Sequence, residues 1–194
     1  MIAQLTGNFL YKTPTRLVVD INGVGYEVNI SLHTYSAISN IAAGTLFTFL
    51  KVSEDAFTLY GFAEQSEKEM FIKLISVSGV GTSTARMMLS SLKPFELQQA
   101  ITTSNVKLLE SIKGIGKKTA ERIALELRDK LGILAAGATS LPVQHNTPES
   151  EALEGLIALG IGKAIAEQAV KKVTHGKTDE LSVETIIKLA LKSL

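Results

Sequence analysis

Two segments of the sequence repeat a pattern of glycine, apolar and small residues that suits phosphate binding. Paired glycines let the backbone turn tightly, because no Cβ stands in the way. The free N–H groups at the start of the following helix then favour an anion. Each segment therefore predicts a helix-hairpin-helix unit, and two units in tandem predict a grip on a nucleic-acid backbone. The copies align at one offset of 35 residues, with Gly79, Gly81 and Thr84-Ala85 in the first and Gly114, Gly116 and Thr119-Ala120 in the second.

The two copies differ in charge. In the second copy two lysines follow the glycines directly, and Arg122 lies four residues after Lys118 on the same helix face. The first copy has Thr82 and Ser83 at the corresponding positions, and hydroxyl groups contact phosphate without adding charge. Arg86, one helical turn further on, is a candidate to supply the missing charge. The candidate DNA-binding residues are Gly79, Gly81, Thr82, Ser83, Gly114, Gly116, Lys117, Lys118 and Arg122.

The net charge of +1 is distributed unevenly along the chain. Residues 65–131, which contain both glycine patterns, hold 11 lysines and arginines against 7 aspartates and glutamates. Residues 1–64 hold 3 against 5, and residues 132–194 hold 6 against 7. A solvated basic surface would have the same composition. The coincidence of the positive excess with the glycine turns favours contact with phosphate.

The sequence shows no catalytic or metal-binding pattern. It contains no cysteine, and its three histidines are scattered without ligand spacing. His175-Gly176-Lys177-Thr178 ends like a P-loop, but Lys171 stands where that motif needs its first glycine. A glycosylase built on this hairpin would need an aspartate further along the chain, and residues 132–142 contain no acid. We therefore expect no catalytic residue, no metal, no cofactor and no ATP hydrolysis by this chain.

Residues 1–64 predict a small β-barrel. Apolar and polar residues alternate on both sides of Asn22-Gly23, a pair that favours a two-residue hairpin turn. Two further strands are expected at Leu46–Val52 and Phe57–Phe62. Several short strands in so short a segment favour a closed barrel of the OB type, because closure leaves no open edge.

The remaining residues predict two helical domains and a linker. Apolar residues recur at helical spacing after residue 65, and Lys93-Pro94 marks a break between the two hairpin units. Near the C-terminus, breaks at Gly160–Gly162 and at Gly176 separate three short helices. The expected fold class is α+β and multidomain, with an OB-type β-barrel at 1–64, an all-α tandem helix-hairpin-helix domain at 65–131, a flexible linker at 132–148 and a three-helix bundle at 149–194.

This order of segments resembles the RuvA family, the Holliday-junction-binding subunits of the bacterial branch-migration complex. The resemblance covers the whole chain. Thr82-Ser83-Thr84 departs from it, since the family commonly has a lysine directly after the first turn. The segments that carry the resemblance are Met1–Gly7, Gly23–Val28, Glu54-Asp55 with Leu59–Phe62, Gly79-Val80-Gly81 and Gly114–Arg122.

The resemblance implies a homotetramer, with an octamer as an open alternative, that holds a four-way junction open and square. Glu54 and Asp55 would be acidic pins near the junction centre, although by themselves they predict only a polar hairpin tip. Their repulsion of phosphate would disfavour continuous duplex. Residues 149–194 would bind the hexameric RuvB ATPase, and the RuvC resolvase is open as a further partner. The implied role is branch migration in DNA recombination and repair, including the SOS response to DNA damage.

Two other functions remain open from the residues alone. One is a DNA-binding scaffold of a repair nuclease, and the other is a protein adaptor whose hairpins serve only for helical packing. No signal peptide and no apolar run of membrane-spanning length is evident, so we expect a cytoplasmic protein. The bundle at 149–194 has more apolar residues than so small a core can bury, which favours an exposed partner site.

Overall fold

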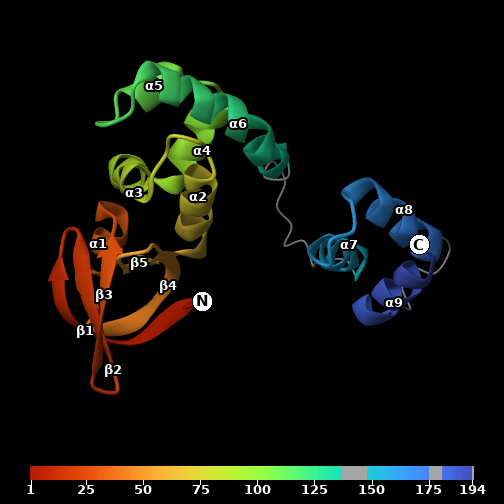
Figure 1. Cartoon of the computed structure of the whole chain (residues 1–194), viewed down its shortest axis with the longest axis horizontal. Helices are drawn as coiled ribbons and strands as arrows, with labels where there is room; N and C mark the ends of the chain where they lie inside the picture. Colours follow the sequence, from red (N-terminus) through yellow and green to blue (C-terminus); the bar gives the residue numbers. More distant parts are fainter. Residues whose placement is uncertain (137–147, 175–180, 194) are drawn as a thin grey trace. The chain divides into compact units, whose positions relative to one another are not determined.

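The computed structural model describes residues 1–136, 148–174 and 181–193. The chain divides into two compact units, Met1–Ala138 and Thr139–Leu194. The first unit contains a β-barrel followed by a group of helices, and the second contains three helices (Figure 1). The expected fold class is therefore confirmed.

Five strands close into a barrel in the order β1-β2-β3-β5-β4, and β4 pairs back to β1. The pair β3–β5 is parallel, and the other neighbours are antiparallel. Inward-facing residues such as Leu17, Val19 and Leu46 are fully buried. The strands are β1 (Gln4–Thr13), β2 (Arg16–Ile21), β3 (Val24–Ile30), β4 (Ala43–Val52) and β5 (Phe57–Phe62).

The turn between β2 and β3 has the predicted two-residue form. Asn22 and Gly23 have φ angles of 52° and 87°, and Ile21 pairs with Val24 across the turn. Positive φ at both central residues matches the right-handed twist of the flanking strands. The carboxylate of Asp20 accepts a hydrogen bond from the Gly23 N–H at 2.9 Å. The turn therefore sets the register that places alternate residues of β2 and β3 inside the barrel.

One helix of the barrel domain was not predicted. Helix α1 (Leu32–Ile38) follows β3 and lies beside helix α3 (Figure 1). Ser31 caps it by accepting a hydrogen bond from the Thr34 N–H at 3.0 Å. Only Thr34 and Ile38 of this helix are buried, so seven residues give too little apolar periodicity to reveal it from sequence.

Five helices continue the first unit around one apolar core. Phe71 joins this core to the barrel, since its ring centroid lies 4.9 Å from that of Phe62 and 5.5 Å from that of Phe49. Pro94 begins α4, at the predicted break between the hairpin units. The helices are α2 (Gln65–Ile75), α3 (Thr82–Ser91), α4 (Pro94–Thr102), α5 (Val106–Glu110) and α6 (Lys117–Ala136).

Helix α6 is longer than the sequence indicated. The expected linker begins at residue 132, but α6 continues to Ala136. Leucine and alanine are strong helix formers, and they outweigh the single Gly132 in this stretch. The rest of the expected linker up to residue 147 lies outside the described residues.

The second unit has its own small core. Helices α7 (Pro148–Ala158), α8 (Lys163–Thr174) and α9 (Val183–Ser193) bury Leu156 and Ile186. Gly160 has a φ of 91° and breaks the chain between α7 and α8, as predicted. The break expected at Gly176 falls outside the described residues. Across the described segments of both units, no helix has the length and apolar composition needed to cross a membrane.

Candidate nucleic-acid interface

The two predicted hairpins have the same turn geometry. Helix α2, its turn and α3 form the first hairpin, and α5, its turn and α6 form the second (Figure 1). Gly79 and Gly114 have φ angles of 90° and 91°. A Cβ at either position would meet nothing within 4 Å, so the need for glycine is conformational rather than steric. Val80 and Ile115 are each 5% exposed and hold the turns onto the helical core.

Both hairpins leave the start of their second helix free for an anion. The carbonyl of Gly81 accepts from the Ala85 N–H at 2.9 Å, and that of Gly116 accepts from the Ala120 N–H at 3.0 Å. Glycine has no side chain to cap the first N–H groups, and neither α3 nor α6 has an acidic residue in its first turn. By contrast, α2 carries Glu67 in its first turn. Both helix starts can therefore donate to phosphate oxygens.

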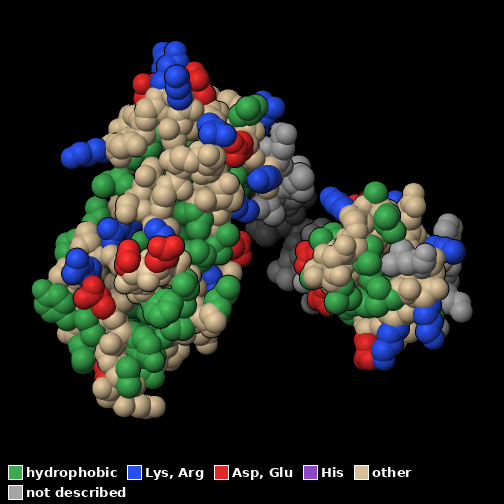
Figure 2. Space-filling view, viewed as in Figure 1, with side chains coloured by type: hydrophobic (Ala, Val, Ile, Leu, Met, Phe, Trp, Pro, Cys, Tyr) green, Lys and Arg blue, Asp and Glu red, His purple; other side chains and the backbone are tan. Residues whose placement is uncertain are grey.

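The second hairpin adds positive charge to this arrangement. Lys113, Lys117 and Lys118 are exposed around its turn. Arg122 is exposed as well, and its Nε donates to Glu126 Oε1 at 2.7 Å. In the first unit, lysine and arginine side chains gather over α5 and α6, while hydrophobic side chains gather over the barrel (Figure 2). Residues 105–131 hold 7 lysines and arginines against 4 acids.

The first hairpin has no charge at the matching positions. Residues 65–104 as a whole hold 4 lysines and arginines against 3 acids. The two hairpins therefore share a turn geometry, but the excess of positive charge lies in the second. The residues of the first hairpin that correspond to Lys113, Lys117, Lys118 and Arg122 are Ser78, Thr82, Ser83 and Met87.

Two side chains of the first hairpin face the barrel. Thr82 is 9% exposed, and its Oγ1 accepts a hydrogen bond from Tyr60 Oη at 2.9 Å. Arg86 donates to Asn29 Oδ1 at 2.8 Å. The suggestion that Arg86 replaces the missing lysine is therefore not supported by its position. Thr82 contributes its backbone N–H to the helix start, and Ser83 remains exposed beside it.

The two acidic residues lie where the sequence places them, at the tip between β4 and β5. Glu54 and Asp55 are both exposed. The tip is closed by the Ser53 N–H, which donates to the Ala56 carbonyl at 3.0 Å. Phe57, at the start of β5, is 77% exposed, so an apolar ring stands beside the carboxylates at the surface. The tip therefore combines negative charge with an exposed hydrophobic residue.

A buried carboxylate that sequence reasoning missed joins the barrel to the helices. Glu67 of α2 is fully buried and accepts hydrogen bonds from Ser31 Oγ and, at 2.6 Å, from Thr34 Oγ1. Thr34 Oγ1 in turn accepts from the Ala63 N–H at 3.0 Å. Burial raises the pKa of the Glu67 carboxyl, and the two hydroxyl hydrogen bonds partly oppose that effect. An acid at this position of an amphipathic helix gives no signal of its burial, because its partners lie more than 30 residues away.

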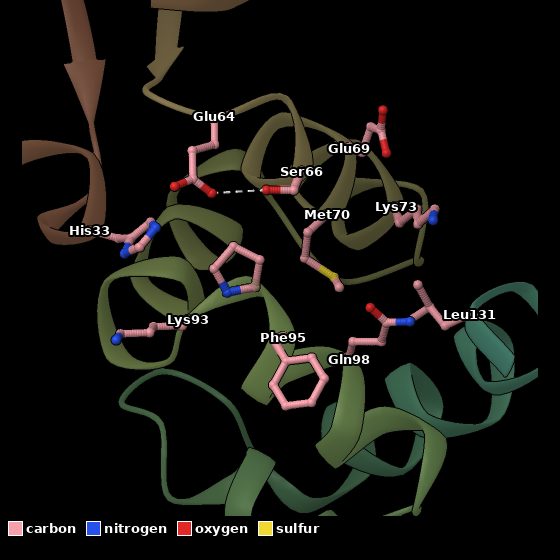
Figure 3. Close-up of a pocket in the computed structure, with 11 residues that line it drawn as sticks. His33, Glu64, Ser66, Glu69, Met70, Lys73, Lys93, Phe95, Gln98 and Leu131 are labelled. Carbon is pink, nitrogen blue, oxygen red and sulfur yellow. Dashed lines mark hydrogen bonds between the residues drawn. The ribbon is translucent and has the colours of Figure 1, made fainter. Parts of the chain in front are cut away.

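A pocket of about 430 Å³ lies between α1, one side of α2, the start of α4 and Leu131 of α6 (Figure 3). Its lining mixes the carboxylates of Glu64 and Glu69 with Lys73 and Lys93. Ser66 Oγ donates to Glu64 at 3.1 Å, so the hydroxyl in the lining is paired with a carboxylate and not with a histidine. Among the residues that the structure describes, no group of acids and histidines could hold a metal ion.

Comparisons with known proteins agree with this architecture. A family model described as RuvA N terminal domain matches residues 1–61, and one described as RuvA, C-terminal domain matches residues 147–194. Between them, a model described as SAM-like helix-hairpin-helix tandem matches residues 71–129.

Relatives match the chain over its whole length. A protein of Christiangramia forsetii is 50% identical over 194 residues, which cover 100% of both chains. A protein of Flavobacterium psychrophilum is 48% identical over 195 residues, again covering 100% of both. A protein of Cytophaga hutchinsonii is 46% identical over 197 residues, covering 99% of each. All three are named Holliday junction branch migration complex subunit RuvA.

Proposed function

The chain belongs to the RuvA family, and from that premise we propose that it binds four-way DNA junctions by their shape. The observation that carries this proposal is the pair of hairpins with matching turns and open helix starts. Contacts to phosphate fix the position of a protein on DNA but carry no base sequence. Two such phosphate-binding hairpins in one chain therefore suit a ligand that is recognised by the path of its phosphate backbone and not by its base sequence.

The second hairpin supplies most of the attraction in this proposal. Lys117 and Lys118 extend the backbone N–H site at the start of α6 with positive charge, and Arg122 lies on the same helix face as Lys118. Arg122 is already held by Glu126, which orients its guanidinium and leaves N–H groups for phosphate. We propose Gly79, Gly81, Ser83, Gly114, Gly116, Lys117, Lys118 and Arg122 as the DNA-contacting residues, with Thr82 contributing its N–H group.

In this proposal the acidic tip disfavours binding of continuous duplex DNA. Glu54 and Asp55 repel phosphates, so a continuous duplex lying across the tip is disfavoured. At the open centre of a four-way junction the strands separate, and the same carboxylates meet fewer phosphates. The tip thus lowers affinity for duplex more than affinity for junction.

The assembly proposed for this function is a homotetramer. A four-way junction has four equivalent arms, and a ring of four subunits presents the same surface to each arm. Two tetramers on opposite faces of one junction would form an octamer. In the tetramer each arm meets the two hairpins of one subunit, and in the octamer it meets those of two subunits, one from each tetramer.

In this proposal the second unit binds a partner protein. Several of its apolar side chains are exposed, although the bundle already has its own core. We propose that this surface binds the RuvB ATPase, so that the chain is the non-catalytic subunit of the branch-migration complex. A resolvase of the RuvC type would act on the same junction. The site of action is the cytoplasm, because the substrate is chromosomal DNA. Among the described residues of the second unit, the large apolar side chains that are exposed are Ile157, Leu159, Ile165, Leu189 and Leu191.

The test is a binding curve for a four-way junction and for a linear duplex of equal length and sequence, measured from 50 to 200 mM salt. We expect a clear preference for the junction and a steep loss of affinity with salt, because phosphate contacts release counterions. The double variant Lys118→Ala with Arg122→Ala should weaken binding to both DNAs. The matched control, Lys171→Ala with Lys172→Ala in α8, removes two charges away from the hairpins. Equal wild-type affinity for the two DNAs would reject junction binding in favour of a scaffold or adaptor role.

A further inference from the structure

Helix α3 is fastened to the barrel along one face. Three polar residues of this helix, spaced one turn apart, each make a hydrogen bond to the barrel domain. The bonds are spread over the start, the middle and the end of the helix, so they fix its direction as well as its position. Tyr60 Oη donates to Thr82 Oγ1 at 2.9 Å, Arg86 Nη1 donates to Asn29 Oδ1 at 2.8 Å, and the Leu32 N–H donates to Ser90 Oγ at 3.1 Å.

The contact of Arg86 is the central one of the three. The same Nη1 also donates to the carbonyl of Thr15 at 3.2 Å, in the turn between β1 and β2. The amide of Asn29 is oriented by its own donation to the Leu59 carbonyl at 3.4 Å. Arg86 thus binds two neutral oxygens from different barrel segments, and its side chain is only partly exposed. These contacts suit a side chain that holds α3 in place better than one that binds a ligand.

The second hairpin has no such fastening. The positions of α6 that correspond to Thr82, Arg86 and Ser90 are Lys117, Glu121 and Leu125, and all three are exposed. Leu125 is 71% exposed. The hydrogen bonds that hold α3 to the barrel are therefore a feature of the first hairpin alone and are not shared by the second.

The outward face of α3 carries no charge. Ser83 and Met87 are exposed there, at the positions that Lys118 and Arg122 occupy in α6. With Arg86 held by the barrel, the positions of the first hairpin that match the charged residues of the second offer phosphate backbone N–H groups and serine hydroxyls but no charge. The position of the first hairpin relative to the acidic tip is also fixed, because Tyr60, which hydrogen-bonds to Thr82, lies on β5, the strand that follows the tip.

We propose that Arg86 is a positioning residue, which sets the first hairpin relative to the acidic tip and so determines the preference for junction over duplex. The first hairpin then acts as an uncharged grip, and the salt-dependent part of the affinity belongs to the second hairpin. The inference rests on the proposed function, since it divides DNA binding between the hairpins.

The experiment compares the salt dependence of binding for matched variants of the full chain. Lys118→Ser gives the second hairpin the residue of the first. It should make the negative slope of log affinity against log salt shallower, by about 0.9 for each phosphate that the lysine no longer neutralises. Ser83→Lys makes the reverse exchange and should steepen the slope by a similar amount. Arg86→Gln should leave the slope unchanged and reduce the junction-to-duplex ratio by at least roughly 2- to 10-fold, the range expected for each hydrogen bond removed, because it takes away the bonds to both Asn29 and Thr15. A fall in slope for Arg86→Gln equal to that of Lys118→Ser would overturn the proposal.

Asn29→Ala tests the same contact from the barrel side, without altering α3. It should reproduce the reduced ratio of Arg86→Gln at an unchanged slope, and thermal unfolding checks that both variants are folded. A wild-type ratio with Asn29→Ala would show that the anchor does not set the preference. The wild-type curve separately tests the proposed function, because equal binding of junction and duplex rejects junction selectivity while the slopes still decide whether Arg86 contacts phosphate.

Discussion

At the scale of single residues, the two glycines of the second hairpin turn differ in whether their backbone conformation requires glycine. Gly114 has a φ of 91°, which a residue with a Cβ adopts only with strain, whereas Gly116 has no such angle. Neither position has an atom within 4 Å of an added Cβ. We expect Gly114→Ala to lower the free energy of unfolding by about 1–2 kcal/mol, and Gly116→Ala to leave it nearly unchanged. Urea unfolding of the two variants measures the difference.

The variants Gly114→Ala and Gly116→Ala also distinguish an effect on stability from an effect on DNA binding. A methyl group at residue 116 would stand at the helix start that is proposed to bind phosphate, so Gly116→Ala should weaken binding to junction and duplex alike in a gel-shift assay. Gly162→Ala, at the corresponding position of the turn between α7 and α8, is the control. If Gly116→Ala bound both DNAs as tightly as wild type, the helix start of α6 would not be a phosphate site.

The residue pattern predicted the turns but not every orientation. Glycine spacing depends on local backbone geometry, so the positive φ angles at Gly79 and Gly114 could be anticipated from the sequence. The inward positions of Thr82 and Arg86 could not, because their partners Tyr60 and Asn29 are 22 and 57 residues away. The roles of the predicted DNA-contacting residues remain predictions.

At the scale of elements, the tip between β4 and β5 is a short turn whose charge can be removed without touching the barrel core. Glu54→Gln combined with Asp55→Asn should tighten duplex binding more than junction binding, since repulsion of continuous duplex is removed. Competition binding with both DNAs gives the ratio. Glu149→Gln with Glu151→Gln, in the first turn of α7, removes the same charge elsewhere. An unchanged ratio in the tip variant would mean that Glu54 and Asp55 are an ordinary polar tip.

The contact between α2 and α1 predicts a pH dependence of stability. Because the pKa of Glu67 is raised above its usual 4.5, the folded state binds this proton more tightly than the unfolded state. The resulting stability is fully present below pH 4.5 and is lost as pH rises through the raised value. Glu67→Gln cannot titrate, so wild type should lose stability relative to the variant across this window, by at most about 1.4 kcal/mol per pH unit.

Urea unfolding at several pH values between 4 and 8 measures that difference. Glu69→Gln, on the exposed side of the same helix, is the control. A difference between wild type and Glu67→Gln that grows in the opposite direction would contradict the sign of the shift.

The long elements with a clear period were the ones that sequence could predict. The strands of the Asn22-Gly23 hairpin and the apolar faces of α2 and α6 all show their period directly. Helix α1 has only seven residues, and its stability comes from the Ser31 cap and from packing, so it gave no comparable signal. The expected linker began at residue 132, where small and breaker residues start, but α6 continues to Ala136, because the leucine and alanine there favour helix.

At the scale of the whole molecule, the two units have separate cores. The core of the second unit consists of residues from α7, α8 and α9, and the cores of the first unit consist of residues 5–131. Deleting residues 149–194 should therefore leave junction binding within about twofold of wild type, a difference below roughly 0.5 kcal/mol. The same deletion should abolish branch migration with RuvB in a strand-separation assay. Loss of junction binding in the truncated chain would place the second unit in the DNA-binding surface.

The anchoring of α3 to the barrel also has a consequence for how the molecule can evolve. One face of α3 meets the barrel through Arg86, another is buried in the helical core, and the third is proposed to meet DNA. Helix α6 has a corresponding face that meets solvent, where Glu121 and Leu125 are exposed. Natural variation among relatives should therefore be narrow at 86 and 90 and broad at 121 and 125. Of the two helices, α3 carries fewer charges than α6, and it is the one on which selection leaves less freedom.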